Sequence, residues 1–461
     1  MKKIDRVIES IQSRITEGRL KPGQKLPSIR QAVDEFGVSK NTVIEAYERL
    51  SARGLIRSVH GAGFFVCAST PAPLSKATQP AHIVEAVDRL TLLTAQLDQE
   101  KLPVRVGDGR PPQSWMNDAL PLRMKGNIFK NFVGDPSGYG GVSGHLQLRE
   151  LIAARSNRAD MSVHPDQIVT TFGANHALDL IIRRYLEPGD VVLVDDPGYY
   201  PLLGKFKLAK IRAIGVPRTP TGPDLDVMET LAAAHGPKMF FTQSTCQNPT
   251  GSSMSLPVAH GVLQVAQRFG LMVIDNDPFT DLPGNAGVPL SALDAFNSVI
   301  AISSFSKLLS ASFRVGYVIA RPEVARELTE LKLLTVVNSS RFSEMVIAEL
   351  IKSQRYGRHL NKLVNRLEEA RRDYHRKVRK LGLDVFCAQE TGYYSFLQLP
   401  HTVDEGQLVR KASAAGIMLA PGRLFAVDEN PARPALRINV TRADDPRFYR
   451  FLKRQVIDGQ V

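Results

Sequence analysis

The chain has 461 residues, 43% of them hydrophobic and 23% charged, which provides a sizeable core and excludes a wholly disordered protein. At about 100–200 residues per domain, this length predicts two to four units. Residues 1–66 carry 12 Lys and Arg against 7 Asp and Glu, or +5 of the formal net charge of +13. That concentration indicates a polyanionic partner for the first segment. The other 395 residues carry +8, which we interpret as thinly spread surface charge.

The apolar runs and the cysteines of the sequence exclude several classes of protein. No run of residues approaches the ~18 uninterrupted apolar residues of a membrane span, and no apolar run follows the charged N-terminus as in a secretory signal. Cys67, Cys246 and Cys387 are odd in number, far apart and without metal-ligand spacing. We therefore expect a cytoplasmic protein with no disulfide framework, no metal site and no membrane partner.

Residues 1–66 predict three helices followed by a β-hairpin. The first helix is indicated by apolar residues at helical spacing, namely Ile4, Val7, Ile8, Ile11 and Ile15. Ser28 and Ser39 are candidate N-caps of the second and third helices, and the third runs to about Arg53. Residues 55–59 and 64–66 flank a glycine-rich turn, which is typical of a wing. The pattern predicts a winged helix-turn-helix, whose third helix starts with side chains suited to base edges and phosphates.

The run KPGQKLPSIRQAVDEFGVSKNTVIEAYERLSARGLIRSVHGAGFFV resembles the winged helix of the GntR superfamily. The resemblance implies binding to a double-stranded DNA operator. It implies DNA contacts by Arg30, Lys40, Asn41, Thr42, His60 and Gly63. Lys40 stands where the family more often has Arg, which keeps a phosphate contact and weakens a bidentate guanine contact.

We predict a winged helix-turn-helix domain over residues 1–67, a linker over 68–98 and a large domain over 99–461. Residues 68–80 are small, polar and proline-rich, as in a tether. Residues 83–97 are amphipathic and form either the first helix of the next domain or a linker segment that docks on it.

The large domain alternates strand and helix patterns. The predicted strands include 167–171, 191–194, 239–242, 271–274 and 299–302. Such alternation predicts an α/β fold with a mainly parallel sheet, and ligands of such sheets bind beyond the carboxyl ends of the strands. We expect a large lobe over about 120–330 and a smaller C-terminal lobe over about 331–461, joined by the N-terminal segment.

Polar motifs follow these strand ends. Lys307 comes after small hydroxyl residues in Ser303-Ser304-Phe305-Ser306-Lys307, which suits a Schiff base beside a phosphate, and Arg314 could clamp that phosphate. Residues 171–175 join a strand to a helix and offer free N–H groups. Residues 247–251 contain an Asn-Pro turn. Tyr199, in a further strand-end motif, could stack on a planar ring. Each motif alone also fits a purely structural role.

Together and in this order, the motifs of residues 100–455 resemble fold-type I pyridoxal-phosphate enzymes of the aminotransferase class I/II group. With the winged helix, the whole chain resembles a MocR-type regulator of the GntR superfamily. The resemblance implies pyridoxal 5'-phosphate as cofactor, bonded to Lys307, and a head-to-tail homodimer. It implies further cofactor contacts by Gly173, Ala174, Asn175, Tyr199, Asn248, Ser304, Ser306, Arg314 and Tyr139, with Tyr139 reaching the neighbouring subunit's phosphate. Arg437 matches the arginine that holds a substrate carboxylate.

One motif departs from the family pattern. Asn276 stands where the family has the carboxylate that meets the pyridine nitrogen, and Phe279 replaces a tyrosine that bonds the phenolic oxygen. Asn cannot supply the charge that keeps this nitrogen protonated. A shifted register, with Asp275 or Asp277 as the partner, is the alternative.

We expect a pyridoxal-phosphate-dependent transcription regulator that senses an amino compound or the cofactor itself, with weak or absent aminotransferase chemistry. A second hypothesis is an active aminotransferase with a vestigial N-terminal unit. A third is a DNA-binding protein with a dead cofactor pocket.

Overall fold

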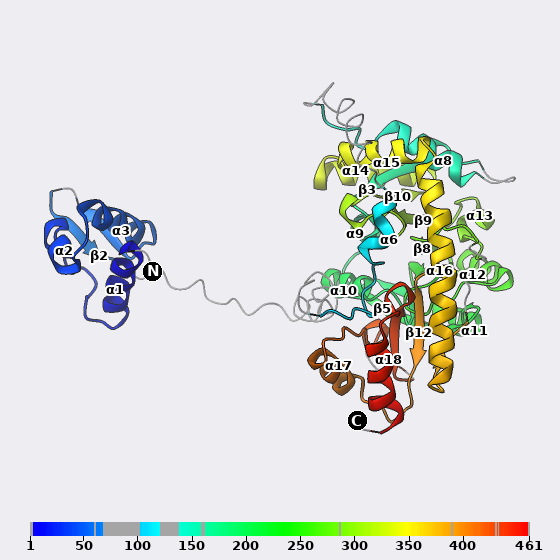
Figure 1. The fold of residues 1–461 in the computed structure, drawn as a ribbon. Coiled ribbons are helices and arrows are strands. Elements are labelled where there is room, and N and C mark those ends of the chain that lie inside the picture. The colour runs from blue at the N-terminus through cyan, green and yellow to red at the C-terminus, as the bar shows by residue number, and fades with distance from the viewer. Residues whose placement is uncertain are drawn as a thin grey trace. The chain divides into compact units, whose positions relative to one another are not determined.

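The computed structural model describes residues 3–59, 61–67, 102–119, 138–157, 162–284, 287–388, 391–428, 431 and 433–459. The chain divides into two compact units, residues 1–80 and 81–461 (Figure 1). The division falls inside the predicted linker. The tether and the amphipathic segment of that linker lie outside the described residues.

The first unit has the predicted helices and hairpin. Its elements are α1 (Lys3–Thr16), α2 (Ile29–Phe36), α3 (Lys40–Ala52), β1 (Ile56–Val59) and β2 (Gly63–Val66), the two strands antiparallel. Ser28 caps α2 by accepting from the Gln31 backbone N–H, and the Gln31 side chain accepts from the Ser28 N–H in return. Ser39 caps α3 in the same position, and Gly37 makes the left-handed bend between the helices. The winged helix-turn-helix is thus confirmed.

Among the described residues of the second unit, eight strands form one sheet in the order β3-β10-β9-β8-β7-β4-β5-β6. The strands are β3 (Ile168–Thr171), β4 (Val191–Asp196), β5 (Arg212–Thr219), β6 (Gly222–Pro223), β7 (Met239–Thr242), β8 (Met272–Asn276), β9 (Val299–Ser304) and β10 (Gly316–Ile319). The five from β9 to β5 run parallel, while β10 and β6 are antiparallel to their neighbours. The mainly parallel sheet is therefore confirmed.

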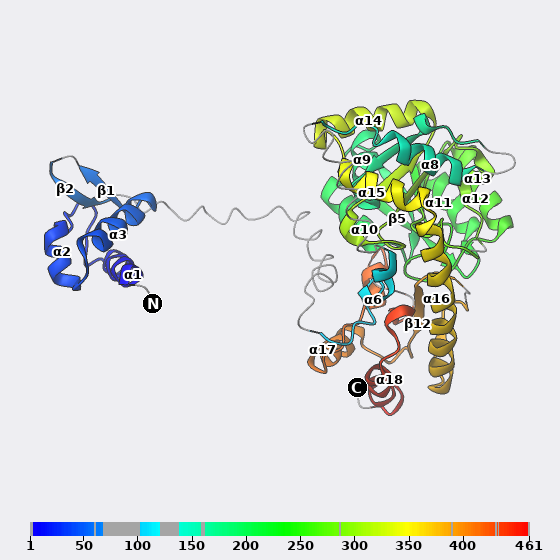
Figure 2. The same cartoon turned by 45° about the horizontal axis from the view of Figure 1, so that its top comes forward.

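Helices bury both faces of this sheet, as Figures 1 and 2 show. On one face, α9 (Ala174–Tyr185), α10 (Tyr200–Ala209) and α14 (Pro322–Val336) pack against Val194 and Ile274. On the other, α11 (Leu225–His235) and α12 (Leu256–Phe269) pack against Leu193 and Val273. Because side chains alternate along a strand, Asn276 belongs to the face of Ile274, and Asp275 to the face of Val273.

A second, three-stranded antiparallel sheet consists of β11 (Asp384–Val385), β12 (Tyr394–Gln398) and β13 (Ala435–Asn439). The long helix α16 (Arg355–Lys380) packs apolar residues such as Leu367 and Val378 into the same core as Leu397 and Ile438. The other α-helices among the described residues are α6 (Gln113–Met116), α8 (Leu146–Ser156), α13 (Leu290–Asp294), α15 (Arg341–Lys352), α17 (Glu405–Ala414) and α18 (Pro446–Leu452). No helix in the described ranges combines the length and apolarity that a bilayer crossing needs.

The charge of the second unit differs from our expectation. Helix α16 carries ten Arg and Lys against three Asp and Glu, so +7 lies on 26 residues. This is nearly all of the +8 that residues 67–461 carry. The basic excess beyond the winged helix is therefore concentrated on one helix, and the interpretation of thinly spread charge was wrong.

Candidate functional site

Lys307 follows β9 and lies in a network formed by distant segments of the chain. Its Nζ donates a 2.7 Å hydrogen bond to the Gly109 carbonyl, which also accepts one of 2.9 Å from the Tyr394 hydroxyl. The Tyr393 hydroxyl donates to the Lys307 carbonyl at 2.8 Å. Burial, followed by the nearby Arg437, lowers the pKa of Lys307 to about 7. A large fraction of the amine is then unprotonated near neutral pH, as a nucleophilic lysine requires.

An anion cradle lies at the start of α9. Gly173 is the residue before this helix and has φ 78°, and Arg314 Nη2 donates to the Phe172 carbonyl at 2.8 Å. A Cβ added to Gly173 would lie 3.2 Å from the Arg314 guanidinium, so the backbone approaches this cation closely. The Ser306 hydroxyl is buried and has no hydrogen-bond partner among the described residues. The N–H groups of a helix start beside a guanidinium suit a phosphate, and an unpartnered buried hydroxyl is a further donor of the kind that a phosphate accepts from.

The other predicted cradle residues lie close by in the chain. Ala174 and Asn175 are the first two residues of α9, and Asn175 is exposed. Ser304 ends β9, and its hydroxyl accepts from the Ser306 N–H at 3.1 Å.

Tyr199, Asn248 and Asn276 line one narrow cavity at the carboxyl ends of the parallel strands. Burial raises the pKa of Tyr199 to about 12, so its phenol is neutral. Asn248 is buried in the Asn-Pro turn. The Asn276 Oδ1 atom is buried and has no hydrogen-bond partner in the described part of the chain. An aromatic ring and two amides around a narrow space suit a flat polar ligand.

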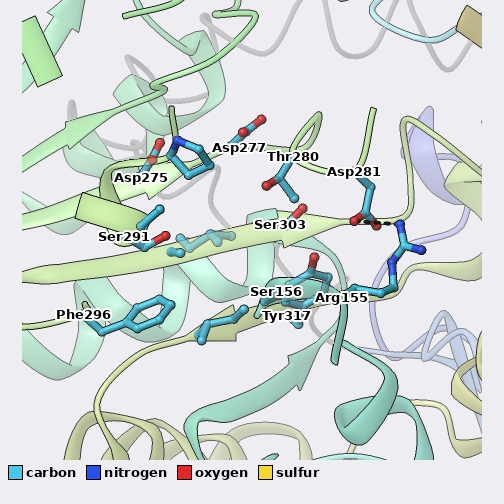
Figure 3. Close-up of a pocket in the computed structure, with 15 residues that line it drawn as sticks. Arg155, Ser156, Asp275, Asp277, Thr280, Asp281, Ser291, Phe296, Ser303 and Tyr317 are labelled. Carbon is cyan, nitrogen blue, oxygen red and sulfur yellow. Dashed lines mark ion pairs between the residues drawn. The ribbon is translucent and has the colours of Figure 1, made fainter. Parts of the chain in front are cut away.

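The two aspartates beside Asn276 lie on the opposite face of the sheet. Asp275 accepts from the Ser244 N–H and hydroxyl at 2.9 and 2.7 Å, and Asp277 accepts from the Thr245 hydroxyl at 2.6 Å. Both line a separate cavity with Asp281 (Figure 3). Burial, then the charge of Asp275, raises the pKa of Asp277 to about 8. Asn276 is thus the residue of this trio that shares the cavity of Tyr199.

Phe279 does not line the cavity of Tyr199 and Asn276. It is buried, and its ring makes edge-to-face contacts with Tyr393 and Tyr394, at centroid distances of 5.1 and 5.8 Å. Because both tyrosines hold the Lys307 network, Phe279 contributes to the site through their packing.

Arg437, on β13, is held rigidly beside Lys307. Its Nη2 donates to the Gly107 carbonyl at 2.5 Å and its Nη1 to Asn248 Oδ1 at 3.4 Å, and it lies 5.2 Å from the centre of the Tyr394 ring. Its Nε is buried without a hydrogen-bond partner among the described residues. A Cβ at Gly109 would lie 3.5 Å from both Arg437 Nη1 and Lys307 Nζ. A cation and an amine this close suit a ligand with a carboxylate and an amino group.

The sequence prediction missed the segment that joins these groups. Asp108 is buried and accepts from Arg110 Nη2 at 3.0 Å, and the Asn439 side chain donates to the Asp108 carbonyl at 2.8 Å. The sequence pattern that could have indicated this segment is Gly-Asp-Gly-Arg-Pro-Pro at residues 107–112.

Two further sets of predicted residues belong to other segments of the chain. Tyr139 is 84% exposed and does not join the Lys307 network within one chain. In the winged helix, Arg30, Lys40 and Asn41 are exposed, while the half-buried Thr42 shares a 2.8 Å hydrogen bond with Ser39. Gly63 begins β2 with φ 104°, and His60 lies outside the described residues.

Comparison with known families assigns both units. The model of aminotransferases of class I and II matches residues 116–453. The chain belongs to this family. The model of the bacterial regulatory proteins of the gntR family matches residues 3–66, so this aminotransferase-family chain carries a GntR-type domain at its start.

Relatives of the family include regulators and enzymes. The HTH-type transcriptional regulator YdcR of Escherichia coli is 28% identical, over 94% of each chain. The 2-aminoadipate transaminase of Thermus thermophilus is 29% identical, over 62% of this chain and 72% of its own. The structure of LysN, an alpha-aminoadipate aminotransferase of that species, matches with a TM-score of 0.72 and 24% identity, over 80% of this chain and 97% of its own.

Membership of the aminotransferase family indicates pyridoxal phosphate as the cofactor, and the site residues fit it. The α9 start, Arg314 and the unpartnered Ser306 hydroxyl would hold the phosphate, and Tyr199 and Asn276 would flank the ring. The Lys307 amine would bond the aldehyde. When bound, the cofactor withdraws electrons from the amino-bearing carbon of a substrate. Since the Asn276 amide is neutral, it would hold the pyridine nitrogen without supplying the charge that favours its protonation.

Proposed function

We propose that the protein is a pyridoxal-phosphate-dependent transcription regulator that binds operator DNA and senses an amino compound or the cofactor itself. One observation carries the proposal. A GntR-type domain is joined to an aminotransferase-family unit in which Lys307 lies beside Arg437, while the neutral Asn276, and neither Asp275 nor Asp277, lines the cavity of Tyr199. This combination favours binding of amino compounds over their rapid turnover.

The first unit supports double-stranded DNA as partner. It has +5 of net charge, and exposed cationic and amide side chains stand at the start of α3. Side chains at this place in a helix-turn-helix reach base edges, while backbone N–H groups meet phosphates. Such a regulator acts in the cytoplasm, where bacterial DNA lies.

The Lys307 network supports sensing. Lys307 and Tyr394 donate to the Gly109 carbonyl, and Arg437 donates to the Gly107 carbonyl of the same segment. An effector whose amino group competes for Lys307 and whose carboxylate competes for Arg437 would change how this segment is held. A ligand that prefers one such arrangement shifts the population towards it.

A head-to-tail homodimer, as the resemblance to MocR-type regulators implies, belongs to the proposal. Tyr139 and Leu334 are each 84% exposed, and Val337 is also exposed. A Cβ at Gly140 would lie 3.0 Å from the Asn338 side chain, so the Tyr139 segment borders the end of α14. An exposed apolar surface of this kind favours burial against a second copy, where Tyr139 would reach the partner's phosphate.

The test combines absorbance with DNA binding. Wild-type protein titrated with pyridoxal phosphate should gain the visible absorbance band of a lysine-bound cofactor, and Lys307→Ala should not. The protein should bind DNA from upstream of its own coding region with a strong salt dependence, and Lys40→Ala should weaken that binding. Rapid conversion of amino acids with cofactor cycling, without DNA binding, would instead support the aminotransferase hypothesis. DNA binding without the visible band would support the third hypothesis, a DNA-binding protein whose pocket does not bind the cofactor.

A further inference from the structure

A second concave site shares no lining residue with the cavity of Tyr199 and Asn276. A groove of about 710 Å³ is lined by α16, by residues 282–284 and by Ala388 and Thr391. Leu282, Val364 and Leu367 give it an apolar floor. This volume falls within the range of sites for small molecules.

The walls of the groove are strongly basic. Arg371, Arg372, Arg376 and Arg379 line it over two turns of α16, and Glu368 is the one acidic residue among the described residues of the lining. Arg376 also pairs with Asp373. Guanidinium groups that line one groove repel one another, so an anion placed among them is stabilised.

The lowered pKa of His375 is consistent with a positive electrostatic potential in the groove. His375 lines the same wall, and its Nε2 is buried without a hydrogen-bond partner among the described residues. Burial, then the charges of Arg371 and Arg379, lowers the pKa of His375 to about 4. The neutral ring leaves the guanidiniums as the groups that would hold a charged ligand.

The groove is connected to Lys307 through a short stretch of chain. The buried Arg371 donates to the Thr391 carbonyl at 2.9 Å and to the Gly392 carbonyl. The next two residues are Tyr393, which donates to the Lys307 carbonyl, and Tyr394, which shares the Gly109 carbonyl with Lys307. A ligand that moves Arg371 therefore acts on a segment that holds the reactive lysine.

We propose that this groove is a second ligand site for a small organic anion, with an aromatic or aliphatic body on the floor and carboxylate or phosphate groups on the arginines. Its occupancy changes the Lys307 network through residues 391–394. The binding step is independent of the proposed function, whereas the coupling rests on the cofactor bound at Lys307.

The shape of the groove favours a small molecule over DNA. A nucleic-acid backbone needs cations spread along an accessible surface and gains little from an apolar floor. Here four guanidiniums surround a concavity whose base is Leu282, Val364 and Leu367. The exposed cations at the other end of α16, such as Arg355 and Arg358, lie outside it.

The binding experiment uses the full chain, saturated with pyridoxal phosphate, and phenyl phosphate as the probe in calorimetry. Wild type should bind one probe per chain in the groove, more tightly than it binds inorganic phosphate, which lacks the apolar body. Arg372→Gln with Arg376→Gln should weaken binding at least 10-fold. Arg355→Gln with Arg358→Gln, the same charge change on the same helix, should leave it within twofold. Arg314→Gln, in the phosphate cradle, should also leave it unchanged and so separates the two sites.

Other outcomes overturn the proposal. Equal losses in the two double variants would mean that only the general charge of α16 attracts the probe. If the Arg372/Arg376 variant keeps its affinity for the probe but loses affinity for a random DNA duplex, the surface is a DNA path. Fluorescence of the single Trp115, in the second unit, confirms that each variant is folded.

A second measurement tests the coupling. Saturating phenyl phosphate should change the apparent affinity for pyridoxal phosphate at least threefold, and the cofactor should change the probe's affinity by the same factor. Tyr393→Phe, which removes the hydrogen bond to the Lys307 carbonyl, should abolish this effect and leave binding in the groove intact. Identical cofactor affinity with and without the probe would contradict the coupling. It would not contradict binding of the probe in the groove.

Discussion

The placement of Asp277 leads to a prediction about stability and pH. This carboxyl is fully buried on the sheet face opposite Asn276, next to Asp275, and its pKa is raised to about 8. In the unfolded chain the pKa of Asp is ~3.9. The folded state therefore holds a proton that the unfolded state releases, so stability falls as pH rises from about 4 to 8 and levels off above. Asp277→Asn removes this proton and should remove the associated slope.

The magnitude follows from the two pKa values. Each pH unit in that window is worth about 1.4 kcal/mol, so the interval from pH 6.5 to 8 corresponds to about 2 kcal/mol. Buried histidines with lowered pKa values, such as His375, contribute an opposite slope mainly below pH 6.5. The difference between wild type and Asp277→Asn cancels their effect. The variant should gain about 2 kcal/mol relative to wild type between pH 6.5 and 8.

Urea unfolding followed by Trp115 fluorescence is the assay, because this only tryptophan reports the second unit. The exposed Asp384 supplies the control, Asp384→Asn, which should not alter the pH dependence. Asp277→Asn should also leave the affinity for pyridoxal phosphate within twofold. An unchanged pH slope would refute the reasoning about the buried proton. A loss of cofactor affinity of 10-fold or more would refute the placement of Asp277 away from the cofactor.

Three further predictions concern the cofactor and DNA sites. Asn276→Asp places a carboxylate in the cavity of Tyr199 and should speed amino-group exchange with amino acids at least 10-fold in stopped-flow absorbance; an unchanged rate would count against the proposed role of Asn276. Ser306→Ala removes a buried hydroxyl of the phosphate cradle and should lower the affinity for pyridoxal phosphate about fivefold, or about 1 kcal/mol, in equilibrium dialysis. Equal affinities of the variant and the wild type would exclude that contact. Lys40→Ala should weaken DNA binding by a similar factor on every sequence and lower the salt slope by about 1 in anisotropy titrations, while a sequence-dependent loss would assign Lys40 to base contacts.

Local patterns in the sequence predicted the elements that depend on local chemistry. Ser28 and Ser39 stand where helices need capping oxygens, and both cap as predicted. The strand before Lys307 is an apolar run, and Lys307 lies just past its end. Apolar runs and caps can be recognised because their stabilising contacts lie within a few residues.

Contacts between distant segments could not be predicted in this way. Gly109 is 198 residues from Lys307 and 285 from Tyr394, so no periodicity indicates that the three meet. The sequence alone could not predict which way the Asn276 side chain points, because this depends on the strand register. A shift of one residue would turn Asp275 or Asp277 into the cavity. The charge of α16 was hidden by averaging over 395 residues, although its 26 residues carry nearly all of that excess.

The central claim is that a ligand state at Lys307 controls DNA binding by the winged helix. Its most direct test is the anisotropy of a labelled duplex from upstream of the protein's own coding region, titrated with full-length protein at fixed salt. Titrations run with and without pyridoxal phosphate, and with the cofactor plus candidate amino acids. We predict that at least one of these conditions changes the dissociation constant fivefold or more for wild type and not for Lys307→Ala. Equal dissociation constants under all conditions, in a wild-type protein shown by absorbance to hold the cofactor, would contradict the claim.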